Sequence, residues 1–342
     1  MNAQQVREAV REGGLFARDR ALLVMLSGGR DSTCLLDVAV ALVGAARVSA
    51  LHVNYGLRPD ADADQRHCAA LCQQLGVELQ VVRPEPSDAP SAPRAAGAPT
   101  VAHGEREPPA PREQPGPAPG NLHAWARELR YAQAARIAGE RDALIATGHT
   151  ASDQVETILY RLAASPGRRA LLGMAASDGR LIRPLLGLTR EQTAAYCRER
   201  GLRWREDESN EDTRYARARV RSGLVPALNA VHPAAAANVL RTAALLREET
   251  EVLDGLVEDE LSGHPSIALT RLRELPAALA RLVVVRLAED ATGGYAPQAG
   301  DHVQEILALA RRGGRAELHL GGRAGAVIDH GELTMVKLPP RT

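Results

Sequence analysis

The chain has 342 residues, and its 42 basic and 42 acidic side chains give a formal net charge of zero. Apolar residues make up 45% of it, enough for packed cores, and no run of 18 or more apolar residues predicts a membrane span. We therefore expect no transmembrane helix. The length predicts about two domains. Because the N-terminus lacks an apolar signal segment, we expect a cytoplasmic protein.

Strand and helix patterns alternate along the first half of the chain. Strands are expected at Ala21–Leu26, Val48–Val53, Glu78–Val82 and Ala143–Thr147, and helices at Thr33–Leu42, Ala61–Leu75, Leu122–Ala138 and Ser152–Ala163. This alternation predicts an α/β fold, in which a twisted parallel sheet carries helices on both faces. Ligands of such sheets bind beyond the carboxyl ends of the strands.

Composition changes twice along the rest of the chain. Residues 83–120 hold 11 of the 21 prolines and almost no bulky apolar side chain, which predicts a disordered insertion. After an edge strand at Leu181–Leu185 and a helix at Thr189–Arg200, the chain becomes helical, and its last part has short alternating runs split by glycines. We expect a catalytic domain over 1–211 and a smaller helical and α+β region over 212–342.

A turn of small residues follows the first strand and leads into a helix. It reads Ser27, Gly28, Gly29, Arg30, Asp31, Ser32. Such a turn exposes backbone N–H groups to phosphate oxygens at the positive end of a helix, and Asp31 could hold Mg²⁺. The lysine of a Walker A loop is absent, so cleavage between the α- and β-phosphates of ATP is favoured over γ-phosphoryl transfer. The alternative is a serine-capped helix start without a ligand.

Polar residues also follow the other strands, at the same edge of the predicted sheet. His52 and Asn54 end one strand, and Gly148 and His149 follow another. Asp153 and Glu156 then lie three residues apart on one helical face, where two carboxylates would suit a cationic substrate. The alternative is that Asp153 only caps its helix and that His149 is structural.

Five ordered blocks together resemble the tRNA(Ile)-lysidine synthetase family of PP-loop enzymes. They are residues 27–32, 52–58, 148–157, 181–185, and 204–210 with the arginine-rich run 214–221. The resemblance implies a two-step reaction on the wobble cytidine of a tRNA(Ile) with a CAU anticodon. ATP adenylates the C2 oxygen of that base and releases pyrophosphate. The ε-amine of free L-lysine then attacks C2 and expels AMP, which gives lysidine.

The same resemblance assigns roles to single residues. The residues that would bind ATP are those of the turn, Ser27, Gly28, Gly29, Arg30, Asp31 and Ser32, together with His52, Asn54 and Gly148. Asp31 would organise Mg²⁺, Asp153 and Glu156 would hold the lysine, and His149 would lie beside the reacting centre. The attacking amine must be neutral, so a base must accept its proton, and we favour Asp153.

Arginines are the residues expected to contact the tRNA, with a solvated helical face as the alternative. The candidates are Arg127, Arg130, Arg183, Arg205, Arg214, Arg217, Arg219 and Arg221. Single-stranded bases are often held by arginine or aromatic stacking, which makes Trp125 a secondary candidate, although core packing is favoured for it. The C-terminal region is expected to bind the tRNA as well.

The chain departs from the family pattern at Tyr55, His123, Ser152 and Ala218, where the family usually has His, Glu, Asp and Asn. Three other functions stay open: a tRNA thiolase, a catalytically impaired PP-loop protein that binds nucleotide or tRNA, and an amidotransferase-like synthetase. Thiolases normally carry paired cysteines, and the four cysteines here form no C-x-x-C pair. The sequence leaves both a monomer and a homodimer open.

Overall fold

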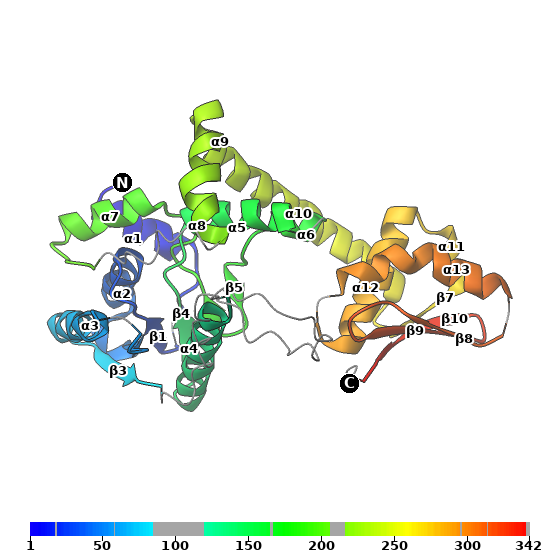
Figure 1. Ribbon diagram of the computed structural model, residues 1–342, viewed down its shortest axis with the longest axis horizontal. Coiled ribbons are helices and arrows are strands. Elements are labelled where there is room, and N and C mark those ends of the chain that lie inside the picture. The colour runs from blue at the N-terminus through cyan, green and yellow to red at the C-terminus, as the bar shows by residue number, and fades with distance from the viewer. Residues whose placement is uncertain are drawn as a thin grey trace, which may run out of the picture. The chain divides into compact units, whose positions relative to one another are not determined.

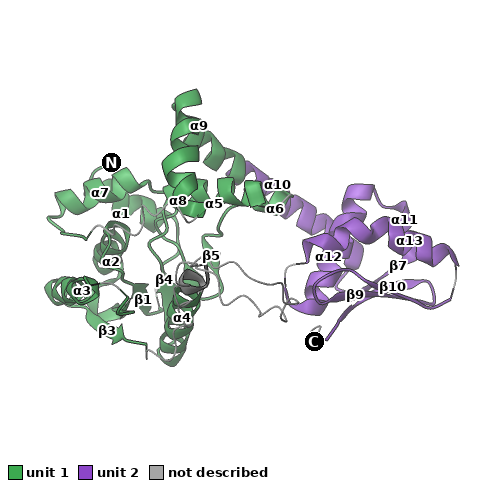
Figure 2. Ribbon diagram, in the orientation of Figure 1, with its two compact units in different colours: residues 1–243 green, residues 244–342 purple. Residues whose placement is uncertain are grey.

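A computed structural model of the protein describes residues 1–17, 19–57, 59–84, 120–164, 167–205, 216–294, 296–312 and 314–339 (Figure 1). Nearly all of the expected insertion at 83–120 lies outside these ranges, and so do Arg214 and the acidic run 206–210. The chain divides into two compact units, residues 1–243 and 244–342 (Figure 2), and the boundary falls within helix α10, Ala235–Leu261.

Unit 1 is built on a six-stranded sheet with the order β3-β2-β1-β4-β6-β5. All neighbouring strands are parallel except β5 and β6. The strands are β1 Leu22–Met25, β2 Val48–Val53, β3 Glu78–Val82, β4 Leu144–Ala146, β5 Ser177–Asp178 and β6 Leu181–Ile182. The helices before α10 are α1 Ala3–Glu12, α2 Arg30–Val43, α3 Ala61–Leu75, α4 Gly120–Glu140, α5 Ala151–Ala164, α6 Arg168–Leu171, α7 Arg190–Glu199, α8 Ala216–Arg219 and α9 Val225–Val231.

Both faces of this sheet are covered by helices, as the apolar run of β1 predicts. Successive side chains of a strand point to opposite faces, so β1 contributes to two cores. Leu22 and Val24 belong to a core that includes residues of α1, α2, α3 and α7, whereas Leu23 and Met25 pack with residues of α4. The predicted fold class is therefore confirmed for this unit.

The expectation of an edge strand at Leu181–Leu185 is wrong. Strand β6 covers only Leu181–Ile182, and it pairs with β4 on one side and with the two-residue strand β5 on the other. The strand stops before Pro184, which has no N–H group to donate to a neighbour. The edge position belongs to β5, whose two exposed residues carry no alternating pattern.

Unit 2 contains a second sheet, which is antiparallel with the order β7-β10-β9-β8. Its strands are β7 Ser266–Ala268, β8 Ala316–His319, β9 Ala324–Asp329 and β10 Glu332–Lys337, and its helices besides α10 are α11 Leu269–Glu274, α12 Ala277–Thr292 and α13 Val303–Arg312. Buried residues of α12, such as Val283 and Val284, share a core with Leu333 of β10. No helix in the described part of the chain is long and apolar enough to cross a membrane.

Candidate functional site

The turn between β1 and α2 is shaped by glycines and by two serine hydroxyls. Gly28 has a φ of +83°, and a Cβ there would lie 3.1 Å from the Cys68 sulfur. The Ser27 hydroxyl accepts from the Gly29 N–H at 3.3 Å and lies 3.1 Å from the Ser32 hydroxyl. No side chain caps the start of α2, so the free N–H groups of its first turn can receive an anion.

Gly148 brings the loop after β4 against this turn. A Cβ at Gly148 would lie 3.0 Å from the Asp31 carbonyl carbon and 3.0 Å from the Ser32 nitrogen, both of which are backbone atoms. Only glycine allows the two segments to approach this closely. The segments that follow β1 and β4, which we expected at the same edge of the sheet, are therefore in direct contact.

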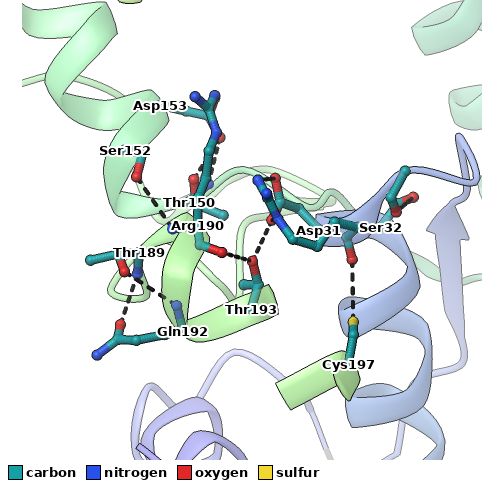
Figure 3. A network of polar contacts seen from close by, with 12 residues as sticks. Asp31, Ser32, Thr150, Ser152, Asp153, Thr189, Arg190, Gln192, Thr193 and Cys197 are labelled. Carbon is teal, nitrogen blue, oxygen red and sulfur yellow. Dashed lines mark hydrogen bonds and ion pairs between the residues drawn. The ribbon is translucent and has the colours of Figure 1, made fainter. Parts of the chain in front are cut away.

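Asp31 is held by two side chains. Its Oδ1 accepts a 2.5 Å hydrogen bond from the Thr193 hydroxyl and a 3.1 Å bond from Arg30 Nε. Thr193 lies in the first turn of α7, and Figure 3 shows that helix reaching Asp31 from below. Within the described ranges, no group of three or more His, Cys, Asp or Glu side chains could hold a metal ion. One carboxylate beside a phosphate-binding turn suits Mg²⁺, which takes much of its coordination from phosphates and water.

His52 and Asn54 are buried and already have partners within the fold. The His52 Nδ1 lies 2.9 Å from the Leu26 carbonyl oxygen, and burial lowers the pKa of its imidazole. The Asn54 amide donates to Asp62 and Gln65 at 2.9 Å each, and its oxygen accepts from the Gly56 N–H. Both residues help to fix the end of β2, and their part in nucleotide binding stays a prediction.

The two candidate carboxylates of α5 share a charged cluster. Asp153 Oδ2 accepts from the Thr150 N–H at 2.8 Å and from its hydroxyl at 2.9 Å, while Oδ1 accepts from Arg190 at 2.6 Å. Glu156 accepts from Arg190 at 2.8 Å and from Arg221 at 2.8 and 3.1 Å. Asp153 thus bonds to Thr150, the residue just before its helix, which agrees with the capping alternative, but it also faces a cation.

The pKa values of the charged residues follow from these contacts. Burial raises the pKa of Asp153, but the Arg190 charge and the two hydrogen bonds from Thr150 outweigh it and hold the pKa below its ordinary value. Burial lowers the pKa of His149 to about 4 against the opposing charge of Asp153. At neutral pH Asp153 is therefore ionised and His149 is neutral.

Arg190 and Thr193 are the site residues that the sequence did not reveal. Helix α7 begins with a capping box between Thr189 and Gln192, which places Arg190 at its first position. A positive charge there opposes the helix dipole, so an arginine at this position was a usable signal of a nearby carboxylate. Nothing in the sequence indicates that Thr193 contacts Asp31, 162 residues away.

The arginines expected to bind tRNA fall into two groups. The charges of Arg127, Arg183 and Arg217 add to the effect of burial in lowering the pKa of His149, so these three arginines share the electrostatic environment of its imidazole. Arg183 is buried, and its Nε has no hydrogen-bond partner among the described residues.

The remaining candidates within the described residues have partners of their own. Arg221 pairs with Glu156, and Arg205 pairs with Asp64 while its backbone N–H donates to the Gly28 carbonyl. Arg130 lies over the Tyr131 ring, 5.9 Å from its centroid, and Arg219 is exposed on α8.

Three of the four departures from the family pattern have a structural setting. The Ser152 hydroxyl accepts from the backbone N–H of Arg190 at 3.3 Å and so joins the start of α5 to the start of α7. The Tyr55 hydroxyl donates to the Ala126 carbonyl at 2.6 Å, and its ring meets Trp125 edge-on. Ala218 is buried, and the side chain of His123 lies outside the described residues.

All four cysteines are buried, and each carries a free thiol. Burial raises the pKa of Cys68 to about 12 and that of Cys72 to about 11. A hydrogen bond between the Cys34 and Cys197 side chains, together with burial, raises the pKa of Cys34. These three thiols are therefore protonated at neutral pH and are poor nucleophiles.

Comparison with known proteins agrees with this geometry. The family model described as the PP-loop domain matches residues 1–228. A tRNA(Ile)-lysidine synthase of Pseudomonas fluorescens is 35% identical over 75% of this chain and 55% of its own length. Another, of Chromobacterium violaceum, is 35% identical over 92% of this chain and 67% of its own length. The chain spans about half the length of the first of these relatives.

A similar fold is found in the U34-tRNA thiolase NcsA of Methanococcus maripaludis. The TM-score is 0.52 at 15% sequence identity, over 71% of this chain and 78% of that one. At this identity the likeness concerns the fold alone. The matching PP-loop model and the 35% identity over two thirds of a full-length relative establish that this chain belongs to the PP-loop family and, within it, to the tRNA(Ile)-lysidine synthases.

Proposed function

We propose that this chain ligates free L-lysine to C2 of the wobble cytidine in a CAU-anticodon tRNA(Ile), with ATP converted to AMP and pyrophosphate. The proposal includes Mg²⁺ as the metal that accompanies ATP, and the cytoplasm as the place of action. One observation carries it: the phosphate-binding turn and the carboxylate pair of α5 are joined into one site by Gly148 and by α7.

The turn supports the first step, adenylation of the base. The Gly28–Gly29 backbone and the start of α2 offer N–H groups to the departing pyrophosphate, and the Ser27 and Ser32 hydroxyls can turn towards it. Asp31 would hold Mg²⁺, which supplies positive charge against the phosphate oxygens when it is bound.

The carboxylates of α5 support the second step, attack by the lysine amine. Asp153 and Glu156 supply negative charge for a cationic amino acid, and the lowered pKa of Asp153 keeps it ionised. We propose that Asp153 accepts the proton that the attacking amine loses. The lowered pKa makes it a weak base, but it is present at neutral pH in the form that accepts a proton.

The arginines beside His149 support an RNA partner. Arg127, Arg183 and Arg217 bring positive charge to the proposed reacting centre, where a tRNA would bring phosphates. We further propose that residues 1–211 carry out the chemistry and that 212–342 contribute to tRNA binding. A homodimer is compatible with this proposal, as is a monomer, and the oligomeric state has to be measured separately.

Sulfur transfer is disfavoured by the state of the cysteines. A thiolase reaction of this class needs a thiolate or a metal–sulfur cluster, and the thiols of Cys34, Cys68 and Cys72 are buried with raised pKa values. No cluster of metal-holding side chains occurs within the described ranges.

The direct test is incubation with ATP, Mg²⁺, radiolabelled lysine and a CAU-anticodon tRNA(Ile) transcript. Label is expected in the tRNA, together with one AMP and one pyrophosphate for each lysine that is incorporated. A matched transcript with a GAU anticodon lacks the wobble cytidine and is expected to stay unlabelled. An unlabelled CAU transcript, in a reaction where a known lysidine synthase labels it, would refute the proposal.

A further inference from the structure

Helix α7 reaches both halves of the site, although none of its residues belongs to the phosphate turn or to α5. Arg190 and Thr193 are three residues apart, so they lie about one turn apart on the same face of the helix. Arg190 bonds to both carboxylates of α5, Asp153 and Glu156. Figure 3 shows Arg190 beside Asp153, and the Thr193 hydroxyl bonded to Asp31.

From this geometry we propose that Arg190 and Thr193 are positioning residues for the ligation reaction, Arg190 for the amine-binding carboxylates and Thr193 for Asp31. The inference rests on the proposed function and assigns one anchor to each of its two steps. A purely structural role would impair both steps alike, whereas here replacement of Arg190 should affect the use of lysine and replacement of Thr193 should affect the binding of ATP with Mg²⁺.

The start of α7 is fixed firmly enough to serve as an anchor. The Ala151 N–H donates to the Leu188 carbonyl at 2.7 Å, and the Arg190 N–H donates to the Ser152 hydroxyl at 3.3 Å. The capping box of Thr189 and Gln192 closes the first turn. The backbone of Arg190, from which its guanidinium extends, is therefore held in place by α5 itself.

The contacts of Arg190 leave room for a further donor. An ionised carboxylate can accept about four hydrogen bonds. Asp153 accepts three, two from Thr150 and one from Arg190, and Glu156 accepts three from Arg190 and Arg221. Among the described residues, each carboxylate therefore keeps about one acceptor position to which an amine could donate while Arg190 stays bound.

The charge of Arg190 also helps to keep Asp153 ionised. Asp153 and Glu156 are 17% and 4% exposed, and two like charges one turn apart in such a place repel each other. Without the cation, burial would raise the pKa of Asp153, and protonation would remove the negative charge that attracts the amine.

Thr193 orients the carboxylate of Asp31, as Arg190 orients those of Asp153 and Glu156. Thr193 is fully buried, donates to Asp31 Oδ1 at 2.5 Å and lies 3.0 Å from the Arg190 carbonyl oxygen. Among the described residues, the other partner of the Asp31 carboxylate is Arg30, whose side chain is 26% exposed and belongs to the turn itself. The hydroxyl of Thr193 therefore sets the direction in which the Asp31 carboxylate points.

The test for Arg190 measures the KM for lysine and kcat in the labelled-lysine assay. Arg190→Gln is expected to raise the KM for lysine about 30-fold or more, because loss of one partner of a buried charge pair has effects of this size. Single-turnover release of pyrophosphate without lysine should stay close to wild type. Arg190→Lys should recover part of the affinity, and Arg198→Gln, an exposed arginine of the same helix, should match wild type.

A different result for Arg190→Gln would overturn the assignment. A lower KM would mean that Arg190 competes with lysine for the carboxylates. An unchanged KM, or an equal loss of pyrophosphate release and lysine incorporation, would mean a merely structural role.

The test for Thr193 is calorimetric binding of ATP, with and without Mg²⁺, so it does not depend on turnover. Thr193→Val is expected to weaken binding in the presence of Mg²⁺ about tenfold and to leave Mg²⁺-free binding and the KM for lysine unchanged. Thr193→Ser, which keeps the hydroxyl, should restore the Mg²⁺-dependent part. Equal weakening with and without Mg²⁺, or no weakening, would refute the role of Thr193.

Wild-type protein separates failure of this inference from failure of the proposed function. If wild type incorporates no lysine, the proposed function is wrong, and the role of Arg190 is wrong with it. If wild type is active and both variants behave like Arg198→Gln, only the inference about α7 is wrong.

Discussion

At the scale of single residues, the site depends on one place where two backbones nearly touch. The missing side chain of Gly148 leaves space that the Asp31 carbonyl carbon and the Ser32 nitrogen occupy, each 3.0 Å from the position of a Cβ. Backbone atoms of a helix start cannot swing aside as a flexible side chain can. A methyl group here must push the loop after β4 away from the turn.

Gly148→Ala is therefore expected to lower the free energy of unfolding by about 1–3 kcal/mol, the usual effect of overpacking. The accompanying shift of about 1 Å should reduce lysine incorporation about 100-fold. Gly139→Ala is the matched control, because a Cβ at this helical position meets nothing within 4 Å. Urea unfolding and the labelled-lysine assay measure both effects, and wild-type activity in Gly148→Ala would contradict the close contact.

The neutral imidazole of His149 should make stability depend on pH. Its pKa is about 4 in the folded protein, chiefly because it is buried, whereas the unfolded chain takes up this proton near pH 6.5. Between these values the unfolded state binds more protons, so stability falls as the pH falls from 6.5 to 4 and loses nothing above 6.5. The total contribution is up to about 3 kcal/mol.

The measurement is the free energy of unfolding of wild type and His149→Gln across this range. The difference between the two proteins should shrink or change sign as the pH falls, since glutamine takes up no proton. Replacement of the exposed His264 by Gln should leave the wild-type profile unchanged. Parallel curves for wild type and His149→Gln would show that the imidazole is not held neutral.

At the scale of elements, a buried aspartate joins the three helices that support the phosphate turn. Asp37 of α2 is 2% exposed and accepts from the Tyr196 hydroxyl of α7 at 2.5 Å and from Arg200 at 3.0 Å. Arg7 of α1 donates to the same Tyr196 hydroxyl at 3.1 Å. Helix α7 therefore depends on this cluster for its place beside α2.

Tyr196→Phe removes the hydroxyl and leaves part of the Asp37 charge without a donor. Loss of a hydrogen bond to a buried charge should lower the free energy of unfolding by about 1.5–3 kcal/mol. Tyr160→Phe, at a side chain that is 41% exposed, should change it by less than about 0.5 kcal/mol. Chemical unfolding of the two variants gives the comparison, and similar values for both would remove Asp37 from the interactions that hold α7.

The elements also show what the sequence could and could not predict. The buried run of β1 and the small residues after it predicted a strand, a turn and a helix, because these signals are local. The contact of Thr193 with Asp31 joins positions 162 residues apart, and no local pattern records it. Strand β5 has two exposed residues and pairs with β6, so no buried apolar pattern in the sequence indicates it.

At the scale of the whole molecule, each unit has a hydrophobic core of its own. Residues such as Leu35 and Tyr196 belong to a core of unit 1, whereas Val283, Ile306 and Leu333 belong to that of unit 2. A separate core is what allows a part of a chain to fold by itself. We therefore expect the units to unfold as two cooperative transitions.

A pair of variants tests this expectation by calorimetry. Tyr196→Phe should lower the melting temperature of one transition, and Leu333→Ala, which leaves a cavity at a fully buried position, should lower the other. The cavity is expected to cost about 2–5 kcal/mol in unit 2. A single transition that moves in both variants would mean that the two cores unfold together.

The buried thiols give the protein a practical property. Because the four native cysteines are buried, a maleimide dye should not react with them in the folded state and should react only with a cysteine that is introduced at the surface. One such cysteine in each unit would accept a donor and an acceptor fluorophore without removal of any native sulfur. Energy transfer between the two dyes would then report the distance between the units in solution, and its change when tRNA is added.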